Sequence, residues 1–395
     1  MNTIRTKKNK KLDLPKKIKN AINHLVKNIN ENGSFLYRDN MNSKVKLKKK
    51  YNWLRHSGTI YALSTYISWS KDFTILHKLK KTAQYLINRS IRPLENDKSL
   101  FAVWSKKKHT GQKHQKIAKL GGSGLALVAL LSLEKISPNF VSNELLESLG
   151  NFLCFMQKEN GGFYSKYIPS QDGKSEKWTS LYYPGEASLG LVMLYEHTKN
   201  KKWLKHAVST ICYLHNKRKS KKIVEADHWA LLATKKILPH IDKLDNSLCS
   251  RENLLDHSIK ICKSILNGLI KEQRGNVPAG CYGMTSRTTP ISTRLEGLLA
   301  AYTFLPKKSN KKLLRKIEKA AHLGVNVLIN SIVERGKFKG AVPRSYFGTL
   351  INSNKIPNKV SYKRFTELRI DYNQHCISAL IQYCDIFIPK LRINH

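Results

Sequence analysis

The sequence predicts an all-α protein in which twelve helices alternate between an inner and an outer ring, an (α/α)6 toroid. Two observations predict this fold. A polar cluster recurs six times where an apolar helix rich in small residues begins, and six other helical patterns between these starts carry more Lys and Glu. Because the inner helices of such a ring run parallel, the clusters should surround one end, which we call the mouth. The clusters are residues 55–58, 121–124, 184–186, 225–228, 294–297 and 369–372.

Each repeat is expected to be an outer helix followed by an inner one. In chain order, the outer helices are predicted at 14–30, 73–90, 141–158, 201–216, 253–273 and 311–333, and the inner helices at 51–70, 122–133, 183–197, 225–237, 293–304 and 366–387. Small residues at helical spacing, as in 125–131, suit an inner helix packed on two sides. The Asn160-Gly161-Gly162 step supplies the positive φ of a tight turn after a helix end. The fifth and sixth connections share a Val-Pro pair, at 277–278 and 342–343, as a repeat would.

Length and composition are consistent with one closed unit. The chain has 395 residues, of which 41% are hydrophobic and concentrated in periodic segments. We expect a basic N-terminus at 1–13, a single toroid domain at 14–388 and a tail at 389–395. The connection 91–120, with Trp104, His109 and His114, is expected to be irregular and to lie on the functional side.

The charge balance is strongly basic. The chain carries 71 Lys and Arg against 27 Asp and Glu, a formal net charge of +44. Such a balance is typical of proteins that bind nucleic acid or another polyanion. Here the lysines are spread over nearly every predicted outer helix and loop, which favours compositional drift over a nucleic-acid surface. An acidic polysaccharide would suit the charge as well as RNA.

Cysteine usage and hydropathy indicate the cellular location. The seven cysteines are an odd number, lie mostly on apolar helical stretches and form no CxxC pair, which predicts reduced thiols in a cytoplasmic protein. The N-terminal stretch has no apolar core, and no run of eighteen apolar residues occurs, so neither secretion nor a membrane span is expected. No cofactor is predicted, and the oligomeric state stays open.

The segment Gln157-Lys158-Glu159-Asn160-Gly161-Gly162-Phe163 resembles the turn between hairpins of the terpene-cyclase and prenyltransferase repeat families. The same helix-NGGF-helix device is found in six-hairpin glycosidases, polysaccharide lyases and sugar epimerases of the (α/α)6 class. This resemblance implies the toroid fold for essentially the whole chain. The Asp-rich DxDD or DDxxD element expected of the terpene-cyclase branch is absent. The carbohydrate branch is therefore favoured, and the terpene-cyclase and prenyltransferase branch is kept as an alternative.

A zinc-dependent lanthionine-cyclase-like enzyme is a further alternative, because Cys281-Tyr282-Gly283 and His375-Cys376 resemble that family's zinc motifs. The Trp that precedes the Cys in that family is missing, and the His-Cys order is reversed. Two adjacent residues on a helix also point about 100° apart. We therefore predict no metal site.

Acidic residues at four predicted inner-helix starts carry the functional prediction. Glu186 and Asp227 are the leading acid and base, with Glu296 and Asp371 as competitors, and an inverting hydrolase would hold its pair roughly 6.5–9.5 Å apart. Each could instead cap its helix. His228 and His375 could abstract and return a proton. The predicted substrate-binding residues are Arg55, His56, Tyr183, Trp229, Tyr282, Arg294, Arg369 and Tyr372, and Trp53, Tyr182 and Tyr346 could also stack on sugar rings.

Together these residues predict a carbohydrate-active enzyme that acts on a sugar or oligosaccharide, anionic ones included, by carboxylate and histidine acid–base chemistry at the mouth. Hydrolase, lyase and epimerase chemistry stay open. The non-enzyme alternative is a toroid scaffold whose basic exterior binds a polyanion with steep salt dependence.

Overall fold

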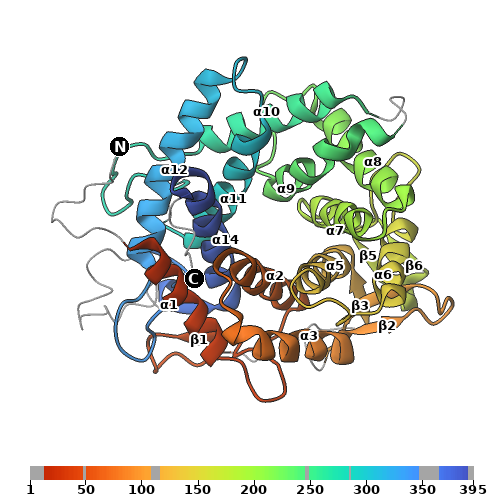
Figure 1. Ribbon diagram of the computed structural model, residues 1–395, viewed down its shortest axis with the longest axis horizontal. Coiled ribbons are helices and arrows are strands. Elements are labelled where there is room, and N and C mark those ends of the chain that lie inside the picture. The colour runs from red at the N-terminus through yellow and green to blue at the C-terminus, as the bar shows by residue number, and fades with distance from the viewer. Residues whose placement is uncertain are drawn as a thin grey trace.

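The computed structural model describes residues 13–47, 50–107, 116–244, 249–283, 286–346 and 364–389. In this part of the chain, six inner helices form a ring inside six outer helices (Figure 1). The inner helices are α2 (Trp53–Ser70), α5 (Leu120–Glu134), α7 (Tyr183–Thr198), α9 (His228–Ile237), α11 (Thr288–Phe304) and α14 (Ile370–Phe387). The outer helices are α1 (Leu14–Lys27), α3 (Leu76–Ser90), α6 (Asn143–Phe155), α8 (Lys201–Arg218), α10 (Arg251–Asn267) and α12 (Lys311–Ser331). The predicted toroid is confirmed.

The inner helices pack side by side in chain order, and α14 closes the ring against α2. Their composition explains the packing. Every residue of α5 is buried, as expected of a helix that is apolar all round. Glycine allows close approach, because a Cβ at Gly124 would lie 2.9 Å from the Ala187 backbone nitrogen, and one at Gly185 would lie 2.7 Å from that of Ala230. The hydrophobic core runs without interruption through the helices of both rings.

The outer helices are amphipathic. In α1 the buried residues include Leu14, Ile18, Ile22 and Leu25, which repeat at helical spacing, while the lysines between them face away from the core. The outer helices therefore need only one packed face, and the lysine-rich remainder stays in solvent.

Four of the connections that follow an outer helix dock on the next outer helix through a glycine. Their φ angles are +87°, +86°, +101° and +85°, in the left-handed region that favours glycine. A Cβ at each would come within 2.5 Å of a backbone carbonyl oxygen of the next outer helix. The pairs are Gly33 with Lys81, Gly161 with Ser209, Gly280 with Leu323, and Gly340 with Asn20. Because Asn20 lies on α1, the Gly340 contact joins the sixth repeat to the first.

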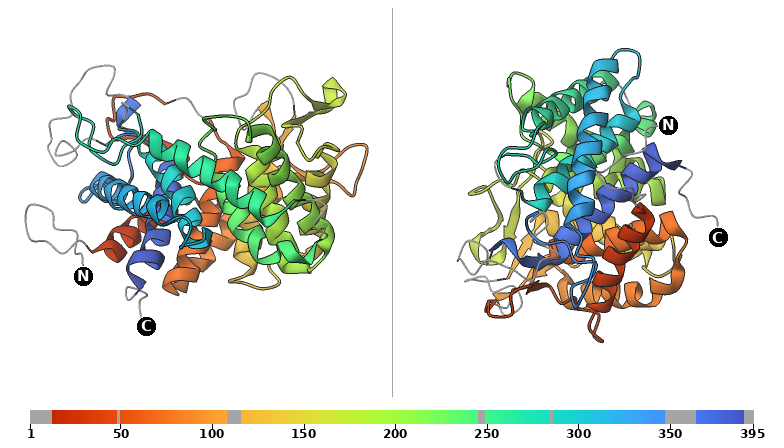
Figure 2. Two further views of the ribbon diagram at one scale, coloured as in Figure 1. Left: turned by 90° about the horizontal axis from the view of Figure 1, so that it is seen from above. Right: turned by 90° about the vertical axis from the view of Figure 1, so that its left-hand side faces the viewer.

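The connections also form two small antiparallel sheets, which gather at one end of the helices (Figure 2). One pairs β1 (Arg38–Asn40) with β7 (Glu367–Arg369). The other has the order β2 (Ile91–Pro93), β3 (Phe101–Ser105), β4 (Ile117–Lys119), β5 (Lys166–Ile168) and β6 (Gly173–Ser175). The connection 91–120 was expected to be irregular, and this expectation is wrong for its three strands. These strands are short, and β4 pairs with β5 from a later connection. The local sequence therefore carries no pattern that predicts them.

Several helix boundaries differ from those expected. The fourth inner helix begins at His228 because the Asp227 side chain caps it. The fifth inner helix begins at Thr288, five residues before the expected 293. The sixth begins at Ile370, because residues 367–369 form β7. Short 3-10 helices cover Phe73–Ile75, Pro169–Gln171 and Leu238–Lys243. In the described residues, no helix has the length and apolar character needed to cross a membrane.

Candidate active site

Three inner helices bring His228, Glu296 and His375 together inside the ring. The Nδ1 of His375 on α14 donates a hydrogen bond of 2.8 Å to Oε2 of Glu296 on α11. The Nε2 of His228, the first residue of α9, lies 4.0 Å from the same oxygen. The two imidazole rings are 5.8 Å apart between centroids and nearly perpendicular. One carboxylate therefore stands next to two imidazoles.

The two histidines differ in charge preference. His228 is 2% exposed, and neither of its ring nitrogens has a hydrogen-bond partner in the described structure. Burial, assisted by the charges of His375 and Arg294, holds its pKa well below the ordinary value. Burial also disfavours a charged His375, but the Glu296 carboxylate outweighs it and raises the pKa of His375. The arrangement thus holds one imidazole neutral and favours the imidazolium form of the other.

Packing fixes the position of the His228 ring. Its centroid lies 4.9 Å from the Trp229 ring and 5.2 Å from the Tyr182 ring, the latter in an edge-to-face arrangement. A Cβ on Gly297 would lie 3.0 Å from the Cβ of His228, so the absence of a side chain at 297 lets α11 approach α9 here. Trp229 also contacts His375, with 6.4 Å between centroids.

The same trio is the group of side chains in the described structure whose donor atoms could surround a metal ion, all within 4.8 Å of one another. Cys281 and Cys376 do not belong to it. Tetrahedral zinc at bond lengths of about 2.0–2.2 Å separates its nitrogen and oxygen ligands by roughly 3.3–3.6 Å. The observed separations from Glu296 are 2.8 Å to His375 and 4.0 Å to His228. These distances fit a hydrogen bond and a neighbouring imidazole better than a metal centre.

Asp371, in the first turn of α14, is held by two arginines. The Nε of Arg55 donates to its Oδ2 at 3.1 Å, and Arg369 donates to both carboxylate oxygens, at 2.5 and 3.0 Å. Burial favours the neutral acid, but the charges of Arg55 and Arg369 outweigh it and lower the pKa of Asp371. Arg55 also donates to the Tyr37 hydroxyl at 2.6 Å. Asp371 is thus an ionised anchor that orients the arginines.

Glu186, on α7, is a carboxyl without a partner. Its side chain is 5% exposed, and Oε2 makes no hydrogen bond in the described structure. Burial, followed by the charge of Asp227, raises its pKa well above the ordinary value. Gly121 of α5 leaves the space that this carboxyl occupies, since a Cβ there would lie 2.0 Å from Oε2 and 2.3 Å from Tyr183 Cδ1.

Asp227, which was expected to be the leading base, makes structural contacts. It is completely buried, its Oδ2 accepts a 2.9 Å hydrogen bond from Arg218, and its Oδ1 accepts one of 3.1 Å from the Ala230 backbone N–H. Both oxygens are occupied by structural contacts. Asp227 caps α9 and anchors Arg218 of α8, so the pair Glu186 and Asp227 offers only one available carboxyl. The helix-cap alternative explains Asp227.

The predicted binding residues divide into two groups. Trp229 and Arg294 lie near the histidine–carboxylate cluster, Arg55 and Arg369 bind the Asp371 anchor, and Tyr183 lies beside Glu186. The other three pack against, or hydrogen-bond to, neighbouring residues. His56 is fully buried, with its ring nitrogens 2.7 Å from the Tyr51 hydroxyl and 2.9 Å from the Thr82 carbonyl oxygen. The Tyr372 hydroxyl donates to Glu367 at 2.5 Å, and the Tyr282 ring is buried against the Arg294 guanidinium at 5.2 Å.

The Arg218 partner of Asp227, the Glu367 partner of Tyr372 and the Tyr37 partner of Arg55 were not expected from the sequence. No local signal marks them, since each pairing joins residues from different elements. His109, His114 and most of the two predicted tails lie outside the described residues.

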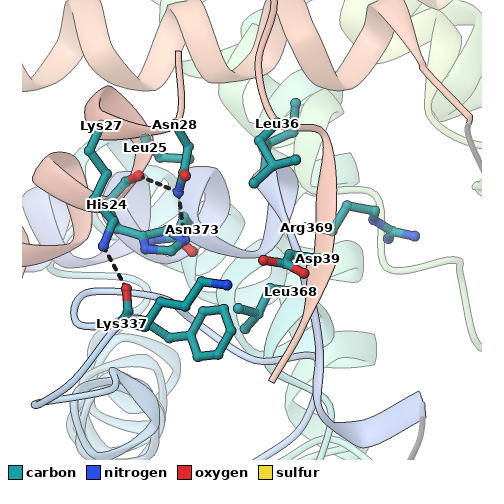
Figure 3. A pocket seen from close by; sticks show the side chains of 12 residues that line it. His24, Leu25, Lys27, Asn28, Leu36, Asp39, Lys337, Leu368, Arg369 and Asn373 are labelled. Carbon is teal, nitrogen blue, oxygen red and sulfur yellow. Dashed lines mark hydrogen bonds between the residues drawn. The ribbon is translucent and has the colours of Figure 1, made fainter. Parts of the chain in front are cut away.

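Two cavities flank these groups. One, of ≈ 310 Å³, lies between α1, β1 and the start of α14, with Arg369 and Asn373 in its wall (Figure 3). The other, of ≈ 230 Å³, is lined in part by Pro184, Arg218 and Glu225. Both reach residues that contact the candidate site, through Arg369 and Arg218.

No protein-family model matches the chain, and no curated protein matches its sequence. Its fold is nevertheless that of known structures. It is similar to a cellobiose 2-epimerase from Bacillus thermoamylovorans, with 11% identity, a TM-score of 0.63, and coverage of 92% of this chain and 98% of that one. A D-mannose isomerase has 12% identity, a TM-score of 0.63, and coverage of 96% and 99%. An α-mannanase from Bacteroides thetaiotaomicron has 14% identity, a TM-score of 0.61, and coverage of 95% and 97%. The fold is thus the (α/α)6 toroid that these structures share.

Proposed function

We propose that this protein is a sugar epimerase or isomerase, which moves a proton next to the carbonyl group of an open-chain sugar. The observation that carries the proposal is the pair of imidazoles with opposite pKa shifts, His228 and His375, beside one carboxylate. Groups whose environments push their pKa values apart are suited to act as base and acid at one pH. The similarity in fold to a cellobiose epimerase and a mannose isomerase agrees with this chemistry.

The proposed reaction needs no external oxidant or reductant. The neutral His228 accepts the proton from C2, the electron pair of that C–H bond forms a C1–C2 double bond, and the carbonyl π pair moves onto O1 to give an enediolate. His375, whose Nδ1–H is held by Glu296, returns a proton to carbon from Nε2. Return to the opposite face of C2 re-forms the C1 carbonyl and gives the 2-epimer. When the C2 hydroxyl proton first moves to O1, return to C1 leaves a carbonyl at C2 and gives the ketose.

The arginines have a positioning role in this proposal. Arg55 and Arg369 are oriented by Asp371, and a guanidinium can donate hydrogen bonds to substrate oxygens in a fixed direction. Trp229 lies against both imidazoles, so it can limit the access of water to the transferred proton. These groups bind and orient the sugar, and the two histidines move its proton.

Hydrolysis is the second candidate, and Glu186 is the observation that favours it. A buried carboxyl with a raised pKa and a free oxygen could protonate a glycosidic oxygen. A hydrolase of the usual type also needs a second carboxylate. Asp227, Glu296 and Asp371 are each bound to a cation or an imidazole, which weakens this alternative.

We further propose a cytoplasmic location and a sugar or oligosaccharide as the partner. The seven cysteines, all within the described residues, form no disulfide, consistent with a reducing compartment.

The decisive experiment is deuterium exchange at carbon. The purified chain, treated with a chelator, is incubated in D₂O with a panel of reducing mono- and disaccharides and followed by proton NMR. We expect the C2–H signal of a substrate to disappear as epimer or ketose forms. Release of a monosaccharide without exchange, with Glu186→Gln abolishing it, would favour hydrolysis. Exchange that depends on added metal would overturn the metal-independent assignment of the trio.

A further inference from the structure

Two lysines face each other across the sheet next to the candidate site. Lys119, at the end of β4, is the register partner of Lys166 on β5. In an antiparallel pair such partners lie on the same face, and like charges in directly opposite positions destabilise the sheet. Lys119 is also close enough to Arg55 for the two cations to repel, as are Lys119 and Lys166. Three cations from α2, β4 and β5 therefore converge.

The two lysines of this group lack a compensating acid in the described structure. Neither lysine forms an ion pair with a described carboxylate, and the sequence contains no Asp or Glu between Asp97 and Glu134. Glu176, which follows β6, is paired with Lys158 instead. Asp371 binds Arg55 but not the lysines.

The other sheet provides an internal comparison. There Arg38 faces Arg369 in the same kind of register. Both arginines contact the Glu367 carboxylate, and Arg369 also binds Asp371. The chain thus neutralises one pair of opposed cations with its own acids and leaves the other pair without them.

The lysines are connected to the candidate site through a series of neighbouring residues. The Lys166 ammonium lies 4.6 Å from the centre of the Trp178 ring, and Trp178 packs edge-to-face on Tyr183 with 5.6 Å between centroids. Tyr183 borders Glu186. On the other side, Arg55 binds Asp371, whose charge acts on His375. Trp178 is 45% exposed, so an aromatic surface for a sugar ring stands beside the cations.

We infer that Lys119, Lys166 and Arg55 form a subsite for a negatively charged substituent of the sugar, such as a carboxylate or a phosphate. This inference rests on the proposed function, because it names the substrate class of the same site. An anion at this position would neutralise the opposed lysines, and the two ammonium groups and the guanidinium supply charge-assisted hydrogen bonds. The basic exterior is not required for this specificity.

Binding measurements test the subsite separately from turnover. Calorimetric titrations compare D-glucose with D-glucuronate and D-glucose 6-phosphate, and D-mannose with D-mannuronate and D-mannose 6-phosphate. The proteins are the full chain, His228→Asn, Lys119→Ala, Lys166→Ala and the control Lys271→Ala, an exposed lysine on another connection. We expect a charged sugar to bind at least about tenfold more tightly than its neutral counterpart. The preference should persist in His228→Asn and Lys271→Ala and fall about tenfold in the Lys119 and Lys166 variants.

A second measurement excludes a merely structural role. Because each lysine substitution removes a like-charge contact, the free variants should melt at the same or a higher temperature than the parent chain while binding the anion more weakly. Preference for phosphate or for uronate identifies the substituent. Equal binding of charged and neutral sugars, binding of no charged sugar, or an unchanged preference in both lysine variants would overturn the inference. If no deuterium exchange at C2 is found while the charged sugar still binds more tightly than the neutral one, the result would count against the proposed reaction alone.

Discussion

The Nδ1 of His375 donates a 2.8 Å hydrogen bond to Oε2 of Glu296, across the contact between α14 and α11. Because a carboxylate can only accept, the bond assigns the proton to Nδ1 and leaves Nε2 for a substrate. It also supplies the negative charge that stabilises an imidazolium in a buried place.

Replacing Glu296 with Gln should reduce kcat/KM roughly 100-fold, since the amide keeps the size but not the charge of the side chain. Without that charge the pKa of His375 falls, so the alkaline limb of the activity profile should move to lower pH. Steady-state kinetics across pH measure both effects. An unchanged alkaline limb would show that Glu296 does not act through His375.

The pH–activity profile of the parent enzyme should be bell-shaped. His228 must be neutral, and its pKa is lowered, so the acid limb lies below the ordinary histidine value of 6.5. His375 must be protonated, and its pKa is raised, so the alkaline limb lies above 6.5. Burial, with the charges of His375 and Arg294, lowers the pKa of His228, and the charges of Glu296 and Asp371 raise the pKa of His375 against burial and Arg55. A single rise through pH 6.5 would contradict this assignment of base and acid.

His228→Asn should lower the rate of C2 proton exchange by roughly 100- to 10,000-fold, because it removes the neutral base. Its matched control is His322→Asn, which removes an imidazole from outer helix α12 that is bound to the Tyr383 hydroxyl. Proton NMR in D₂O gives both rates. Similar losses in the two variants would indicate a general effect on folding rather than on catalysis.

Asp227→Asn should act on stability. It leaves the buried Arg218 without its carboxylate at 2.9 Å, although Glu225 remains 3.3 Å away. We expect the free energy of unfolding, measured with urea, to fall by about 3 kcal/mol. The kcat of the folded variant should change less than about threefold, far less than in a catalytic variant. A loss of kcat as large as that of His228→Asn, with stability intact, would restore Asp227 as a catalytic residue.

Gly340→Ala tests the docking of the sixth connection on α1. An added Cβ would meet the Asn20 carbonyl oxygen at 1.9 Å, in a backbone with φ of +85°. We expect a loss of about 3 kcal/mol. Gly336→Ala is the control, because its φ is +72° but nothing lies within 4 Å, and it should cost about 1 kcal/mol. Equal losses in urea unfolding would mean that the close contact contributes nothing.

Much of the fold could be predicted because each helix carries its own signal. The small residues of α5 and α7 indicate burial on all sides, and the lysine-rich faces of α1 and α12 indicate the outer ring. The strands gave no such signal, since Lys119 and Lys166 meet only after a whole hairpin has folded between them. Short elements that pair across connections depend on tertiary structure.

The residue types of the candidate site could be predicted, but not their partners. His375 and Glu296 are 79 positions apart, and only the ring geometry joins them. From the sequence we predicted Glu186 and Asp227 as the leading pair over Glu296 and Asp371, whereas burial and pairing separate Glu186, whose Oε2 has no hydrogen bond in the described structure, from Asp227, which caps a helix. That distinction depends on Arg218, which arrives from an outer helix.

Ring closure couples synthesis to the assembly of the candidate site. The Arg55–Asp371 contact spans 316 positions, and Gly340 docks on Asn20 of the first helix. A nascent chain that has emerged only through α11 already contains His228 and Glu296. The faces of α2 and α11 that pack against α14 in the complete ring are still uncovered. Contacts of such high sequence separation form slowly, and open apolar flanks invite aggregation or chaperone binding. The emergence of α14 therefore seals the barrel and, in the same event, supplies His375.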